Sequence, residues 1–286
     1  MPPDVGLAAA RFATMAVFLA MAGIPFYLAT TGEKLIGRTT RIALAVLALS
    51  AFVASLWWAA ASVAAMAGVR FAQLDGDTFI AVLDATPLGT VLNMLLAASV
   101  ALLAALAVYP RTLPLALIAF AALASSAWTG HSGAAEGMTG QLQRMLDVVH
   151  LGAASLWLGA LLVFLSSFLS QTDSHTRVER LSAFARTGTL IVVLLAVTGT
   201  ANAMLIGRAG WSIRSGWTLL LAAKIALFLA MLGFAALNRW QLTPALERGT
   251  PGAEKRLLTS LSLETACALA IVALVAMLGM LDPGGA

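Results

Sequence analysis

Eight long runs of apolar residues, separated by short polar breaks, are the feature of this sequence that most restricts its fold. A helix of roughly 20 apolar residues crosses a hydrocarbon core of about 30 Å, and lipid offers no partner to a free backbone N–H or C=O group. The sequence therefore predicts an all-α, polytopic transmembrane bundle of about eight spans. These cover approximately residues 6–30, 42–67, 87–109, 112–130, 144–169, 187–206, 217–238 and 259–281.

The breaks between the runs contain turn-forming and charged residues, as at Tyr109-Pro-Arg and in the polar, proline-containing stretch 239–255. One boundary is less regular, because residues 79–83 are apolar and lie just before Pro87. We expect them to form a short helix in the membrane interface. A seven-span arrangement stays open, since it would follow if the chain did not turn tightly at Pro110.

The composition supports a lipid environment and argues against nucleic acid. Of the 286 residues, 60% are hydrophobic and 10% are charged, with a mean hydropathy of +0.93, a balance that is not typical of a soluble domain. The net charge of +4 comes from basic residues that form no stripe with interleaved aromatic residues. We interpret residues 1–286 as a single integral membrane domain whose surface faces lipid.

The basic residues predict the orientation of the bundle. Eleven of them fall in the loops that follow the first, third, fifth and seventh runs, whereas the opposite loops hold four. Because Lys and Arg accumulate in cytoplasmic loops, both termini are predicted to lie outside. The eleven are Lys34, Arg38, Arg41, Arg111, Arg177, Arg180, Arg186, Arg239, Arg248, Lys255 and Arg256, and the four are Arg70, Arg144, Arg208 and Arg214.

Six polar residues fall at one depth, in the outer third of the membrane, when about 1.5 Å is counted per residue from each helix end. They come from five different runs. Ionisable groups at such a depth are costly and usually face the interior of a bundle or a cavity. We therefore expect a shared polar site that opens outward, formed by Arg11, Asn93, Asp147, His150, Asn202 and Lys224.

His150 is the residue of this set best suited to metal chemistry. Asp147 lies three residues before it and Trp157 seven after it, so all three share one helix face, and the carboxylate can orient the imidazole. His131 precedes this helix between residues that include two glycines, which let the backbone bend its imidazole toward His150. The third histidine, His175, falls in a basic inner loop, where solvation is its expected state.

Sulfur-containing side chains provide further candidate metal ligands. Imidazole and thioether groups suit copper, and Met138 and Met145 flank the segment between the two outer histidines, so either is a candidate ligand, whereas ordinary packing is expected of most other methionines. Near the inner face, Glu264 and Cys267 stand three residues apart and can share a face on an exit path. The alternative for Cys267, the single cysteine, is a small apolar packing residue.

Several stretches together resemble the bacterial copper resistance protein D family (CopD/PcoD). The similarity covers about residues 125–245, and the helix from His150 to Gly159 and the intramembrane Lys224 are its specific part. The matching stretches are Trp128-Thr-Gly-His-Ser-Gly, Leu146-Asp-Val-Val-His-Leu-Gly-Ala-Ala-Ser-Leu-Trp-Leu-Gly, Arg180-Leu-Ser-Ala-Phe-Ala-Arg, Thr198-Gly-Thr, Ala223-Lys-Ile and Asn238-Arg-Trp.

The resemblance implies an eight-span protein of the bacterial inner membrane. Such a protein takes copper from the periplasm, often from a small CopC-like copper carrier, toward the cytoplasm. Carried over to this sequence, His131, His150, Trp157 and Lys224 are the implied functional positions. Some family members carry the carrier domain fused to the membrane part, and we expect any such partner of this chain to be a separate protein.

Two function classes are open at this stage. The first is a copper transporter that is not an enzyme; no GxxxxGK[ST] motif is present, so ATP hydrolysis on this chain is not expected to drive it. The second is a haem-binding membrane oxidoreductase of the HemJ-like type, in which His131 and His150 are the axial ligands. Absorption in the visible range distinguishes the two.

Overall fold

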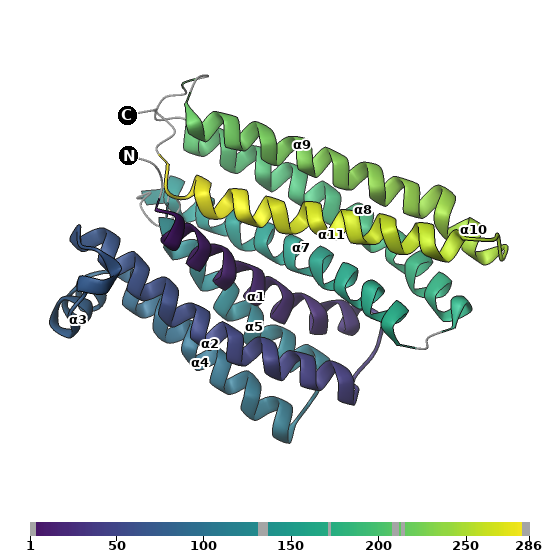
Figure 1. Cartoon of the computed structure of the whole chain (residues 1–286), viewed down its shortest axis with the longest axis horizontal. Coiled ribbons are helices and arrows are strands. Elements are labelled where there is room, and N and C mark those ends of the chain that lie inside the picture. Colours follow the sequence, from purple (N-terminus) through teal and green to yellow (C-terminus); the bar gives the residue numbers. More distant parts are fainter. Residues whose placement is uncertain (1–3, 131–136, 171–172, 208–211, 213–214, 282–286) are drawn as a thin grey trace.

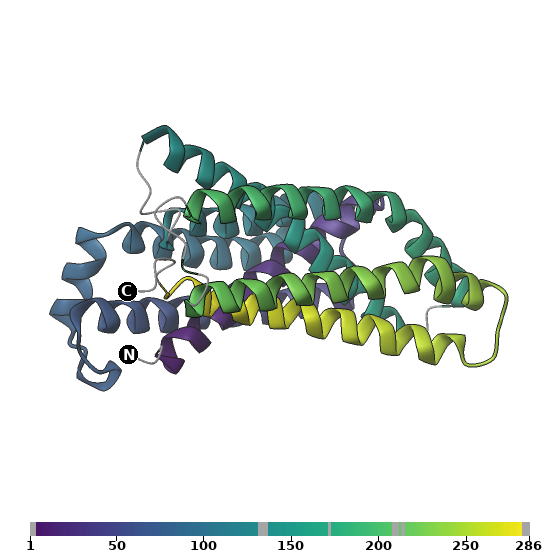
Figure 2. The ribbon, with the colours of Figure 1, turned by 90° about the horizontal axis from the view of Figure 1, so that it is seen from above.

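The computed structural model describes residues 4–130, 137–170, 173–207, 212 and 215–281. Within these ranges the chain is almost entirely helical, and the long helices run side by side along one axis (Figures 1 and 2). The elements are α1 (Val5–Thr30), α2 (Arg38–Ala67), η1 (Phe71–Gln73), α3 (Gly76–Ala85), α4 (Pro87–Val108), α5 (Thr112–Ser125), η2 (Ser126–Trp128), α7 (Gly137–Leu169), α8 (Ser174–Ile206), α9 (Gly216–Leu237), η4 (Asn238–Leu242), α10 (Thr243–Glu247) and α11 (Ala253–Leu278).

Each of the eight predicted runs corresponds to one helix, which confirms the all-α membrane fold. Among the described residues, seven helices are long and apolar enough to cross a membrane. The eighth, α5 with η2, is apolar but shorter, covering Thr112–Trp128. The chain does turn at Pro110, because the backbone N–H of Arg111 donates to the carbonyl of Tyr109 at 2.8 Å and α5 starts at the next residue.

Several helices extend beyond the apolar runs that predicted them. α7 begins at Gly137 rather than near residue 144, and α8 begins at Ser174 rather than near residue 187. The added turns are polar, because a helix that leaves the hydrocarbon core can continue into water with its backbone hydrogen bonds intact. The apolar runs therefore gave the membrane-embedded parts of these helices and not their full length.

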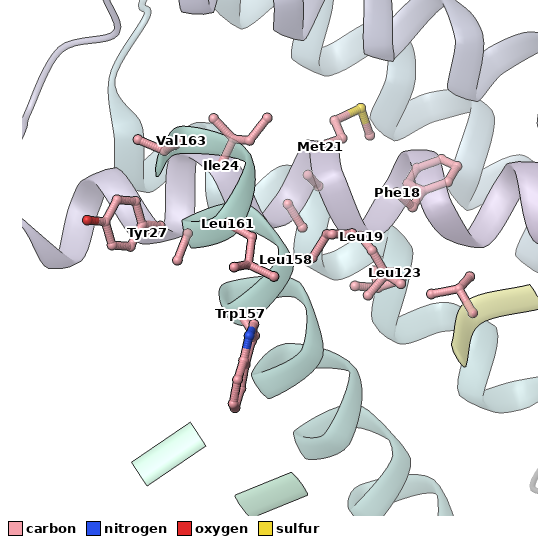
Figure 3. Packing of buried hydrophobic residues seen from close by; sticks show 14 of the residues in the cluster. Phe18, Leu19, Met21, Ile24, Tyr27, Leu123, Trp157, Leu158, Leu161 and Val163 are labelled. Atoms are coloured by element: carbon pink, nitrogen blue, oxygen red, sulfur yellow. The ribbon is translucent and has the colours of Figure 1, made fainter. Parts of the chain in front are cut away.

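α1 is the central helix of the bundle and packs against α2, α5, α7 and α11. Figure 3 shows its apolar side chains Leu19, Ile24 and Tyr27 beside residues of α7. The two helices approach closely at Gly23 of α1, where an added Cβ atom would lie 1.9 Å from the carbonyl oxygen of Ser155. Close helix approach through small residues is the usual packing solution in membranes.

The loops rich in Lys and Arg lie together at one end of the bundle (Figure 1). There, the loop between α1 and α2 binds the turn before α5: the Thr112 hydroxyl donates to the Glu33 carbonyl at 2.6 Å, and the Ile36 N–H donates to the Pro110 carbonyl at 3.0 Å. Arg180 of α8 adds an ion pair with Glu33 at 3.1 Å. This end is the predicted cytoplasmic side.

The opposite end carries the start of α1, the end of α11 and the short helix α3 (Figure 1). α3 confirms the short helix expected at residues 79–83, and it packs against α2 and α4. Its N-terminus is capped by Asp75, whose carboxylate accepts from the Thr78 N–H at 2.8 Å. This end therefore contains a helix outside the long bundle helices, next to the region where the polar residues gather.

Candidate functional site

A cavity of about 290 Å³ lies at the end of the bundle where α1 begins and α11 ends. Its walls come mainly from α1, α7, α8, α9 and α11, and apolar side chains such as Phe18, Leu151 and Ile271 form much of its surface. The polar exceptions include five of the six residues predicted to converge, contributed by four helices. These are Arg11, Asp147, His150, Asn202 and Lys224.

His150 is held in one orientation by α8. Its Nδ1 lies 2.8 Å from the hydroxyl oxygen of Thr198, and that hydroxyl donates its single proton to the Leu194 carbonyl at 2.5 Å. With the hydroxyl proton on that carbonyl, the imidazole Nδ1–H is the donor to Thr198, which in a neutral ring leaves the lone pair of Nε2 free. In metal-binding histidines, a hydrogen bond donated by the ring nitrogen that does not face the metal fixes the tautomer in this way.

Gly199 contributes to the same orientation, because its missing side chain lets the imidazole contact α8 closely. A Cβ atom at this position would lie 3.3 Å from His150 Cε1, which is tighter than ordinary packing. Thr198 and Gly199 therefore define the position of His150 from two sides. The sequence placed these residues in the family motif but did not indicate that they contact His150.

Asp147 lies one turn before His150 and accepts a short hydrogen bond from the side-chain amide of Asn202. The other end of that amide, Oδ1 of Asn202, is buried and has no hydrogen-bond partner among the described residues. Lys224 of α9 lines the same cavity and interacts electrostatically with Asp147 and with His150. The arrangement combines a carboxylate, an amide and an ammonium around one imidazole.

Arg11 lines the cavity at the end of the bundle where α1 begins. Its guanidinium packs against two glycines, which have no side chain to obstruct it. A Cβ atom at Gly279 would be 2.2 Å from Arg11 Nη2, and one at Gly130 would be 3.9 Å from the same atom. The Nε atom of Arg11 is buried and has no hydrogen-bond partner among the described residues. A positive side chain in an otherwise apolar helix was the sequence signal for this position.

Trp157 and Glu264 form a second polar group, outside the cavity. The indole N–H of Trp157 donates to Glu264 Oε1 at 2.8 Å, and the side-chain amide of Asn238 donates to Oε2 at 2.9 Å. All three side chains are buried. Sequence reasoning grouped Trp157 with His150 and missed Asn238, whose signal was a polar residue at the end of an apolar helix. Cys267 is half-buried against the apolar core.

Three other predicted residues do not line the cavity. Asn93 is exposed on α4, while Met138 and Met145 are 81% and 67% exposed on the first turns of α7. Neither methionine is among the residues that line the cavity. His131 lies outside the described residues, and the described residues contain no group of three or more His, Cys, Asp or Glu side chains arranged to hold a metal.

The fold and the cavity define a multi-pass membrane protein with an internal polar site that holds one oriented imidazole. Comparison with protein families places the chain more narrowly. The family described as "Copper resistance protein D-like, N-terminal domain" matches residues 1–141, and "Copper resistance protein D" matches residues 178–278. The chain belongs to the copper resistance protein D family. Asp147, His150 and Trp157 lie between the two matched ranges.

Two curated proteins are similar to this chain. "Copper resistance protein D" of Pseudomonas syringae pv. tomato is 33% identical over 183 residues, which are 60% of this chain and 59% of that protein. "Inner membrane protein YebZ" of Escherichia coli K12 is 26% identical over 178 residues, which are 61% of each chain. The chain thus spans about three fifths of the length of these relatives. No solved structure matches it.

These relatives and the membrane-spanning helices together place the protein in the bacterial inner membrane as a multi-pass protein. The family match also extends the similarity seen in residues 125–245 to the N-terminal helices, where the sequence alone showed only apolar character. The N-terminal helices α1, α2 and α4 therefore belong to the part of the chain that matches the family.

Proposed function

We propose that this protein moves copper across the inner membrane, from the periplasm toward the cytoplasm, and that the ion enters through the cavity around His150. The observation that carries the proposal is the orientation of this imidazole. The Thr198 hydroxyl oxygen accepts a hydrogen bond from Nδ1–H, so Nε2 keeps a lone pair for a metal. Imidazole is a good ligand for copper ions, and the Asp147 carboxylate one turn away adds negative charge that attracts a cation.

The relatives support the assignment of copper as cargo. The Pseudomonas protein is named for copper resistance, and the family that matches residues 178–278 has the same name. In this proposal the protein is a carrier rather than an enzyme, so copper crosses without a chemical change. A CopC-like periplasmic carrier would deliver the ion at the end of the bundle where the cavity lies, and His131 would act as a second ligand.

The second polar group fits the proposal as a later point on the path. Glu264 is buried between Trp157 and Asn238, and its described partners are neutral donors rather than cations. Cys267 lies one turn nearer the cavity end of α11 and is half-buried. A carboxylate and a thiol on adjacent turns offer an ion leaving the cavity two further ligands before it reaches the cytoplasmic end.

The test is copper bound per purified protein for His150→Ala. We expect a loss of copper affinity of at least 10-fold, because even changes in groups around metal ligands typically cost 10- to 100-fold. His175→Ala is the matched control, since His175 is 82% exposed and lies at the opposite end of the bundle. Applied to His131→Ala, the same titration tests the second ligand.

Two results would contradict the proposal. Unchanged copper stoichiometry and affinity in both His131→Ala and His150→Ala would exclude the cavity as the site where copper enters. A strong Soret band in the absorption spectrum of the purified protein would instead support the haem-binding oxidoreductase, with these two histidines as axial ligands. A colourless protein that retains copper supports transport.

A further inference from the structure

The charges that line the cavity are unusual for a site that receives a cation. Arg11 and Lys224 each contribute a positive charge, and Asp147 is the only acidic side chain among the described lining residues. A copper ion adds further positive charge to a space that is lined mostly by apolar side chains. Like charges repel strongly where water does not screen them, so the described lining alone does not balance a bound copper ion.

We propose that the cavity binds copper together with a small monovalent anion, and that Arg11 and Lys224 hold this anion. The inference rests on the proposed function and adds a second ligand to it. The anion is a halide or a simple carboxylate that also coordinates copper. It enters as a ligand, so copper keeps its oxidation state and no electron or proton is transferred.

The surroundings of Arg11 give stronger support for the anion site than those of Lys224. A guanidinium presents five N–H donors in a planar fork that suits anions, yet the Nε atom of Arg11 is buried without a hydrogen-bond partner among the described residues. An unsatisfied buried donor is costly. The guanidinium itself packs against Gly279, where a Cβ atom would lie 2.2 Å from Nη2, so its position depends on the missing side chain of that residue.

Lys224 supplies the second positive charge from another wall of the cavity. In the part of the chain that the structure describes, neither Arg11 nor Lys224 makes a salt bridge within 4 Å. The Asp147 carboxylate interacts with Lys224 electrostatically but is itself hydrogen-bonded by Asn202. An anion between Arg11 and Lys224 would satisfy both groups.

The anion also completes the coordination of copper. His150 offers one free ring nitrogen, Nε2, and no described thiol or thioether side chain other than that of Met15 lines the cavity. An anion held by Arg11 and Lys224 adds a charged ligand from other helices that line the same cavity. Copper and the anion would therefore raise each other's affinity, and by thermodynamic linkage the two factors must be equal.

The experiment titrates copper into the purified full chain with a chromophoric chelator that sets the free copper concentration. Methanesulfonate is the only anion at first, and chloride or formate is then added in separate arms. We expect either effective anion to raise the copper affinity at least 10-fold in the wild type. Arg11→Gln should reduce this enhancement to below 2-fold, while Arg248→Gln, which removes an exposed guanidinium at the opposite end, should retain it.

A measurement without variants guards against misfolding of Arg11→Gln. Binding of radioactive chloride or formate to the wild type, with and without copper, must show the same enhancement factor. Enhancement by one anion supports the site and identifies its preferred ligand. Copper affinity that is the same in all three anions would overturn this inference and leave the proposed function intact, whereas absence of copper binding in every anion would overturn the proposed function itself.

Discussion

Two glycines determine how closely the central helices approach. A Cβ atom at Gly23 of α1 would lie 1.9 Å from the Ser155 carbonyl oxygen, and one at Gly159 of α7 would lie 2.0 Å from the carbonyl carbon of Gly23. The obstructing atoms are backbone, which cannot rotate away as a side chain can. Because both helices line the cavity, this contact also sets the distance between Arg11 on α1 and His150 on α7.

Gly159→Ala is therefore expected to separate α1 from α7. We predict a loss of roughly 1–3 kcal/mol or more in stability, the usual cost of overpacking, together with weaker copper binding. The matched control is Gly233→Ala on α9, where an added Cβ meets nothing within 4 Å. There, the higher helix propensity of Ala should stabilise the helix by up to about 1 kcal/mol. Thermal unfolding in detergent measures both, and equal effects would contradict the prediction.

At the scale of elements, the N-terminus of α8 is stabilised by residues that the apolar pattern did not include. The Asp173 carboxylate caps the helix by accepting from the N–H and the hydroxyl of Thr176, both at 2.9 Å. These hydrogen bonds lower the pKa of Asp173 below its usual value. Arg177 then joins three helices by donating to the Ser167 carbonyl and to the Glu254 carboxylate. The polar extension of α8 is thus an ordered part of the bundle.

The cap predicts a pH dependence at this end of α8. A pKa that is lowered on folding contributes stability above the unfolded value, near pH 3.9 for Asp, and this stability is lost as the pH falls through the folded pKa. The hydrogen-exchange protection factor of the Thr176 amide should therefore decrease in acid. In Asp173→Asn, which keeps a capping side chain but does not titrate, it should stay constant, and a parallel decrease in both proteins would contradict the assignment.

At the scale of the whole molecule, the alternation of eight helices brings the basic loops to one end and the polar cavity to the other. Gly279, just after α11, lies against the side chain of Arg11 in α1, so the first and last helices meet at the cavity end. Arg180 pairs with Glu33 and Arg177 with Glu254 at the basic end. The separation agrees with a cytoplasmic basic end and a periplasmic cavity.

Reporter fusions test this orientation directly. We predict that alkaline phosphatase fused after residue 286 is active, because the positive-inside distribution places both termini in the periplasm. Green fluorescent protein at the same position should not fluoresce. As a control, both reporters fused within the loop after Arg248 should give the opposite pattern, since this loop lies at the basic end. A fluorescent C-terminal fusion would reverse the direction of transport that we propose.

The amino-acid sequence is sufficient to predict the eight apolar helices and the inward placement of most of the cavity residues. Apolar length is sufficient for the first, because a lipid-embedded backbone can satisfy its hydrogen bonds only within helices or closed barrels. The cost of charge in lipid is sufficient for the second, since it directs Arg11, Asp147, His150 and Lys224 inward at one level. The shared face of Asp147 and His150 follows from helical periodicity alone.

The neighbours that these side chains contact could be identified only once the packing of the helices was known. Periodicity fixes the face that a residue occupies on its own helix, but the rotation of that helix and the identity of the adjacent helix depend on packing over the whole bundle. Thus Asn93, which was predicted to join the polar site, is exposed on α4, and Trp157 binds Glu264 and does not line the cavity. The free Nε2 of His150 depends likewise on Thr198, 48 residues away along the chain.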